Sequence, residues 1–284
     1  MQRTFGSALH LAIFTVMTVR KAWAFIQRDF IEAISYRLAF VFQLLSIGLM
    51  VLLFFFISRL LGEAASPYLQ QYGGDYFAFV LIGLALARYT GVALNSFASN
   101  ISRAQSTGTL EALLVTQTGA STIIVSSSLY TYLWATFDVF IYLVGGVLLG
   151  VDLSRANVPA ALFALGLTTV CFSSLGIIAA SFIIVFKRGD PITWLMSNAS
   201  SLLGGAYFPI SVLPGWLQPM SLFLPTTYAL QAMRLALLQG ASFSQLSGDL
   251  VMLAIFALLL LPTSLVAFRY AVRRAKIDGS LTHY

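Results

Sequence analysis

Charged residues are scarce in this chain. Only 9% of its 284 residues are Asp, Glu, Lys or Arg, whereas soluble domains usually contain about a quarter. So few charges cannot cover a water-facing surface of this size, and 59% of the residues are hydrophobic, with a mean hydropathy of +0.88. The composition therefore predicts an integral membrane protein, and it excludes a soluble enzyme or a protein that binds nucleic acid.

Residues that carry catalysis, metal binding or nucleotide binding are also few. The single cysteine, Cys171, cannot form an intrachain disulfide, and the two histidines, His10 and His283, lie near opposite ends. No lysine is followed by Ser or Thr, so the chain lacks the Gly-x-x-x-x-Gly-Lys-[Ser/Thr] phosphate cradle. We therefore expect no metal, catalytic or ATP site of this kind on the chain, and we interpret Cys171 as a packing residue.

Long uncharged or nearly uncharged runs mark the expected membrane spans, since one helical crossing needs about 20 mostly apolar residues. The pattern predicts an all-α integral membrane protein with six transmembrane helices. The expected spans cover residues 38–58, 76–99, 120–150, 156–186, 192–207 and 250–268.

Proline is concentrated in one segment between the last two spans. Four of the eight prolines are Pro209, Pro214, Pro219 and Pro225, and this spacing forbids a continuous helix. The segment is nevertheless apolar and includes Trp216. We interpret residues 208–233 as a re-entrant external helical hairpin, with an ordinary external loop as the alternative.

The distribution of Lys and Arg predicts the orientation in the membrane, because cytoplasmic segments carry an excess of these residues. If the N-terminus is cytoplasmic, all but four of the sixteen lie on the cytoplasmic side. The exceptions are Arg59, Arg155 and Arg234 outside and Arg88 within the membrane. With six spans, both termini are then cytoplasmic.

Residues 20–35 have the pattern of an amphipathic helix that lies in the membrane interface. A signal peptide is a poorer interpretation, because Arg20 and Lys21 fall between the apolar run and the apparent cleavage site. The helix is either a plain topological anchor or a docking surface for a cytoplasmic partner. On a helical wheel Trp23, Ile26, Phe30 and Ile34 gather on one face, opposite Lys21, Arg28, Asp29 and Glu32.

Arg88 and Asp138 are the charges inside expected spans. An unpaired charge at mid-bilayer costs at least about 2.5 to 3.5 kcal/mol. Both residues are expected about 20 Å below the outer boundary at 1.5 Å rise per residue. We therefore predict an intramembrane ion pair between Arg88 and Asp138, which either fixes helix register or has a role in gating or substrate contact.

Two further segments have patterns that favour contacts. Residues 99–118 are expected to form a turn with a short surface helix, since Thr109 can cap it and Glu111 falls in its first turn; this is either a linker or a coupling element. Ser197, Ser201 and Gly205 recur every fourth residue, which permits close helix approach and suggests a pathway or homodimer face.

The combination resembles the permease subunit of an ABC-2 type (type V) ABC exporter. The resemblance is carried by SRAQSTGTLEALLVTQT after the second span and by GGAYFPISVLPGWLQPMSLFLPTTYALQAMRLALLQG before the last. It implies a single transmembrane domain over residues 1–284. Its parts would be a cytoplasmic N-terminus with the interface helix (1–36), a six-span bundle (37–272) containing the coupling turn (99–118) and re-entrant segment (208–233), and a cytoplasmic tail (273–284).

The resemblance also implies a function. The chain would dimerise in the bacterial inner membrane, bind two copies of a separate ATP-binding subunit that holds ATP and Mg, and move a hydrophobic or amphipathic substrate (drug, lipid or lipid-linked glycan) outward by alternating access. A secondary transporter, or a membrane enzyme without an ATPase partner, is the alternative. The residues expected to couple to the ATPase are Arg20, Lys21, Arg28, Glu32, Arg103, Gln105, Thr107 and Glu111.

Overall fold

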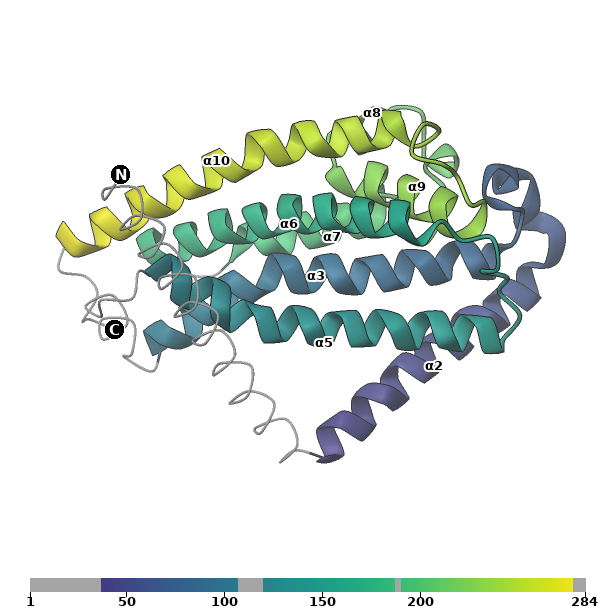
Figure 1. Cartoon of the computed structure of the whole chain (residues 1–284), viewed down its shortest axis with the longest axis horizontal. Coiled ribbons are helices and arrows are strands. Elements are labelled where there is room, and N and C mark those ends of the chain that lie inside the picture. Colours follow the sequence, from purple (N-terminus) through teal and green to yellow (C-terminus); the bar gives the residue numbers. More distant parts are fainter. Residues whose placement is uncertain (1–36, 107–119, 187–189, 278–284) are drawn as a thin grey trace, which may run out of the picture.

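The computed structural model describes residues 37–106, 120–186 and 190–277. This part of the chain is all helical and contains no strand (Figure 1). Within these ranges, five helices are long and apolar enough to cross a membrane. They are α2 (Arg37–Leu61), α3 (Tyr76–Ser106), α5 (Ala120–Leu148), α6 (Val158–Phe186) and α10 (Ser247–Ile277).

The bundle has two distinct ends. The connections 62–75, 149–157 and 239–246 lie together at what we call the loop end, on the right of Figure 1. Helices α3, α6 and α10 run away from it, and α5 runs toward it. The loop between α2 and α3 contains two short 3-10 helices, η1 (Gly62–Tyr68) and η2 (Gln70–Tyr72).

Helix α3 is the centre of the bundle. It packs against α5 on one side and α6 on the other, and α6 also packs against α10. The approach of α3 to α6 is close, because a Cβ added at Gly176 would lie 2.5 Å from the carbonyl oxygen of Leu94. Helix α2 contacts α3 and α5 and crosses the bundle at an angle (Figure 1).

The expected fifth span corresponds to α7 (Pro191–Leu203), which is only 13 residues long. At 1.5 Å per residue it extends about 20 Å, less than the roughly 30 Å hydrocarbon core. The helix begins where the Asp190 carboxylate accepts a hydrogen bond from Thr193 N at 2.9 Å. It ends before Gly205, whose φ of 81° lies in the left-handed region that glycine tolerates. The expected helical stretch 204–207 is therefore a turn.

The proline-rich segment forms short helical pieces. They are η3 (Ile210–Val212), α8 (Gln218–Ser221) and α9 (Pro225–Leu238). Pro209 directly precedes η3, Pro219 lies in the first turn of α8 and Pro225 begins α9, so these prolines occupy positions where the missing N–H is tolerated. Pro214 and Trp216 lie exposed between η3 and α8. Helix α9 continues to Leu238, past the expected limit at 233.

Several boundaries differ from those expected. Helix α3 continues to Ser106, past residue 99 where the turn was expected, because residues 99–106 contain neither Gly nor Pro to end it. Helix α10 likewise continues to Ile277, so the expected tail begins inside it. Arg103 and Gln105 thus lie in the last turns of α3. The interface helix, with Arg20, Lys21, Arg28 and Glu32, and the coupling residues Thr107 and Glu111 lie outside the described residues.

Candidate functional site

The ion pair expected from the sequence is present between α3 and α5. Arg88 Nε donates to Asp138 Oδ2 at 2.9 Å. Arg88 lies about 18 Å and Asp138 about 15 Å from the loop-end termini of their helices, at 1.5 Å per residue. The two side chains differ in exposure, since Asp138 is 1% exposed and Arg88 is 45% exposed.

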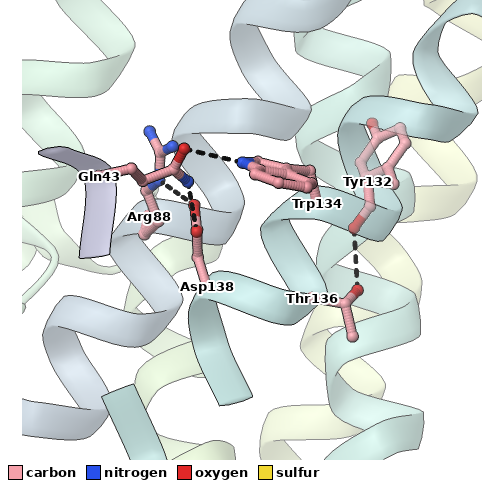
Figure 2. Close-up of polar contacts among 6 residues, drawn as sticks. All are labelled: Gln43, Arg88, Tyr132, Trp134, Thr136 and Asp138. Carbon is pink, nitrogen blue, oxygen red and sulfur yellow. Dashed lines mark hydrogen bonds and ion pairs between the residues drawn. The ribbon is translucent and has the colours of Figure 1, made fainter. Parts of the chain in front are cut away.

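A third helix joins this pair through Gln43 of α2 (Figure 2). The Gln43 amide donates from Nε2 to Asp138 Oδ1, and its Oε1 accepts a hydrogen bond from Trp134 Nε1 at 2.9 Å. The carboxylate of Asp138 therefore has a donor at each oxygen. Gln43 and Trp134 are not among the residues expected from the sequence. Gln43 is nevertheless the one amide in the apolar run 38–58, and an amide at membrane depth needs a hydrogen-bond partner.

An aromatic cluster adjoins this network. The rings of Phe40, Trp134 and Phe137 lie within contact of one another, with centroid separations of 5.7 to 6.0 Å. Phe40 comes from α2, whereas Trp134 and Phe137 come from α5. The network thus has an apolar, aromatic surface directly beside it.

Helix α3 presents a polar stripe, which we define as Arg88, Gly91, Asn95 and Ser99. Their spacing of three or four residues places them on one helix face. Arg88, Asn95 and Ser99 are exposed, although most of α3 is buried. A Cβ added at Gly91 would meet no atom within 4 Å, so the stripe borders open space. Polar side chains at membrane depth rarely face lipid, so this face is a candidate for contact with water or substrate.

A small cavity lies beside the stripe, between α3, α6, α7 and α9. The cavity volume is about 20 Å³, which is enough for one water molecule. Thr226 Oγ1 is buried without a partner in the described part of the chain. Other hydroxyl-bearing residues of the lining are Thr90, Ser197, Ser200 and Ser201.

The residues Ser197, Ser201 and Gly205, expected on a pathway or dimer face, are not equivalent. Ser197 and Ser201 line the cavity, and Ser201 Oγ donates to the Ser197 carbonyl at 2.9 Å. Gly205 is buried in the turn after α7. The strongly exposed side of α7 carries Trp194, Leu195 and Leu202 instead.

Arg234 of α9 is a second arginine that the structure places inside the protein. The sequence places it in a segment expected outside the membrane together with Arg59 and Arg155, and the structure shows that its side chain is buried within the protein, 2% exposed. Its Nε, Nη1 and Nη2 donate to the carbonyls of Phe79, Gly205 and Ala206 at 2.9 to 3.1 Å.

Tyr72 of η2 completes the surroundings of Arg234, whose guanidinium carbon lies 5.7 Å from the Tyr72 ring centroid. Burial raises the pKa of the Tyr72 phenol, and the nearby Arg234 charge opposes that shift. The phenol is therefore neutral at physiological pH. Arg234 accordingly depends on carbonyls and aromatic rings rather than on a carboxylate.

Metal chemistry has no support in residues 37–106, 120–186 and 190–277, where no three His, Cys, Asp or Glu residues are grouped. Cys171 is buried and its Sγ lies 3.5 Å from the Leu253 carbonyl oxygen. This position agrees with a packing role.

Two comparisons bear on the identity of the chain. A family model described as ABC-2 type transporter matches residues 20–238, which is more than half of the sequence. No curated protein matches the chain. The matched range includes Arg88, Asp138, Arg234, the α3 stripe and helices α2 to α9.

Proposed function

The chain belongs to the ABC-2 type transporter family, and from this premise we propose that it is the permease subunit of an ATP-driven exporter. It moves a hydrophobic or amphipathic substrate outward by alternating access. The proposed setting is the bacterial inner membrane. The permease does not catalyse by itself, since the energy comes from an ABC ATP-binding subunit that holds ATP and Mg.

The polar stripe on α3 is the observation that carries this proposal. Arg88 and Asn95 are exposed within a helix that is otherwise the most enclosed of the long spans. Placing these side chains against lipid is costly, so we assign the stripe to the wall of the translocation path. In a homodimer, the stripes of two copies would face a shared path.

The proposed topology has six passes with the loop end outside and both termini in the cytoplasm. Helix α7 is the fifth pass, extended across the bilayer by the turn that follows it. The re-entrant segment is supported by exposed apolar side chains such as Val212, Trp216 and Phe223. Helix α9 supports re-entry as well. Thr226, in its first turn, borders the cavity between the helices, and Gln239, directly after its end, lies beside Gly73 in the loop end, so α9 leads from the cavity back to the loop end.

The proposed coupling acts on the helices that carry the ion pair. Residues 107–119 connect α3, which carries Arg88, to α5, which carries Asp138. A push from the ATPase on Arg103, Gln105, Thr107 and Glu111 would therefore move the two charged helices directly. The interface helix, with Arg20, Lys21, Arg28 and Glu32, is the second proposed contact.

Co-purification tests this proposal. The full-length tagged chain is purified from native membranes and its partners are identified by mass spectrometry. We expect an ABC-type ATP-binding subunit in equal amount, with ATPase activity that falls in the Glu111→Ala and Arg103→Ala variants. Arg59→Ala, at the opposite end of the bundle, is the matched control. A chain that never retains such a subunit under mild solubilisation would be a different kind of transporter.

A further inference from the structure

The two arginines at membrane depth differ in how their donors are used. Arg234 directs Nε, Nη1 and Nη2 to protein carbonyls and is 2% exposed. Arg88 uses only Nε, and its Nη1 and Nη2 have no acceptor among the described residues. All three nitrogens of the Arg234 guanidinium thus donate to protein carbonyls, whereas Nη1 and Nη2 of Arg88, which we call its outer fork, do not donate to any described residue.

The network around Asp138 fixes the direction of that fork. Asp138 accepts a hydrogen bond from Arg88 Nε at one carboxylate oxygen and from Gln43 at the other. Both oxygens therefore have a donor, and neither accepts from Nη1 or Nη2 of Arg88. In Figure 2 these nitrogens point away from Asp138. The ion pair neutralises the charge of Arg88 but leaves four N–H groups that require acceptors at membrane depth.

The surroundings favour an amphiphile. The open position beside Gly91 leaves the stripe accessible, and the cluster of Phe40, Trp134 and Phe137 adjoins the network through Trp134. A planar guanidinium fork matches two oxygens of a phosphate, and aromatic rings suit a hydrocarbon chain. One end of the site thus offers free guanidinium N–H donors, and the other end is apolar.

We propose that Arg88 binds the phosphate-bearing head group of an anionic amphiphile, whose chain lies along the aromatic cluster. This inference rests on the proposed function, in which the stripe lines the path, and it narrows the substrate class from hydrophobic molecules in general to anionic amphiphiles. Asp138 and Gln43 are positioning residues, because they hold Nε and leave Nη1 and Nη2 for the ligand.

Native mass spectrometry of the purified full-length chain tests this site. The probes are phosphatidylglycerol, phosphatidylcholine and inorganic phosphate. We expect phosphatidylglycerol to bind about tenfold more tightly than phosphatidylcholine, because both lipids carry a phosphate but the choline cation of phosphatidylcholine neutralises its phosphate and is repelled by the guanidinium. Inorganic phosphate at equal concentration should not displace the lipid; if it does, the site takes a free anion and the amphiphile proposal is overturned.

Three variants assign the binding to Arg88. Arg88→Lys retains the charge but not the fork and should lose most of the preference. Arg88→Gln alone leaves a buried carboxylate uncompensated, so the double variant Arg88→Gln/Asp138→Asn is used to keep a neutral, foldable pair. It should lose the preference entirely, whereas Arg59→Gln, exposed at the loop end, should keep it. Preference that survives the double variant, or is absent from the wild type, overturns the inference.

Failure here is separable from failure of the transporter assignment. The binding measurement needs no ATPase subunit, and co-purification of that subunit needs no lipid preference. A stable complex with the ATPase together with Arg88-independent lipid binding would remove this site and leave the proposed function standing.

Discussion

Arg234 lies over the ring of Phe79, with its guanidinium carbon 3.3 Å from the ring centroid and its Nε donating to the Phe79 carbonyl at 3.1 Å. The same side chain holds the turn after α7 through the carbonyls of Gly205 and Ala206. One residue of α9 therefore connects the turn after α7 to the loop-end part of α3. Without it, these carbonyls would be buried with no donor.

Arg234→Gln should destabilise the protein strongly. Each buried carbonyl that loses its donor costs roughly 1 to 3 kcal/mol, and three carbonyls depend on this guanidinium. We expect a clear fall in the thermal unfolding temperature of the detergent-solubilised protein. Arg155→Gln, in the exposed connection 149–157, is the matched control and should change stability by less than about 0.5 kcal/mol. Equal unfolding temperatures for the two variants would contradict this account.

Gly83→Ala should disrupt the same contact from the other side. A Cβ at this position in α3 would lie 2.0 Å from the Ala206 carbonyl oxygen and 2.8 Å from Arg234 Nη2. The turn must move away, which costs about 1 to 3 kcal/mol. Gly48→Ala in α2 is the control, because a Cβ there meets no atom within 4 Å, and it should gain roughly 0.5 to 1 kcal/mol from helix propensity. Thermal unfolding of both variants checks the opposite signs.

Charge placement made part of this arrangement predictable. The start of α3 at Tyr76 agrees with the expected span, because Asp75 accepts a hydrogen bond from Phe77 N at the helix start. The Arg88 and Asp138 pair was predictable as well, since two isolated charges at similar depth compensate each other at lower cost than either does alone.

Other features depend on geometry that a linear pattern does not contain. Arg234 follows an apolar, proline-broken run and therefore looked like a loop residue. Only the folded turn shows that the Gly205 and Ala206 carbonyls point at it. The contact of Gln43 with Asp138 similarly depends on the angle at which α2 crosses α5, and the short length of α7 depends on the left-handed conformation of Gly205.

Gln43→Leu should weaken the network without removing the ion pair. The change deprives Asp138 Oδ1 of its amide donor, which costs roughly 1 to 3 kcal/mol for a buried acceptor. Trp134→Phe removes the donor to Gln43 Oε1, and its effect should be less than additive with that of Gln43→Leu because the two residues share one network. Ser46→Leu, at an exposed position of the same helix, should be nearly neutral. Additive losses in thermal stability would show that the contacts act independently.

Cysteine accessibility distinguishes a water-lined stripe from a lipid-facing one. The native Cys171 is buried, so it should remain unmodified by a water-soluble thiol reagent in intact membranes. Asn95→Cys on the α3 stripe should react, because thiolate formation requires water. Val266→Cys in α10 is the matched control, since Val266 is 66% exposed and lies at about the same depth, roughly 28 Å from the loop-end terminus of its helix.

We expect Asn95→Cys to react at least about tenfold faster than Val266→Cys, since only a hydrated thiol ionises appreciably. In the complex with the proposed ATPase subunit, its rate should also change when ATP is added, because the proposed alternating access would open and close the path along the stripe. Equal rates at the two positions would place the stripe against lipid. The exposure of Arg88 and Asn95 would then need a different explanation, such as burial against a second copy of the chain.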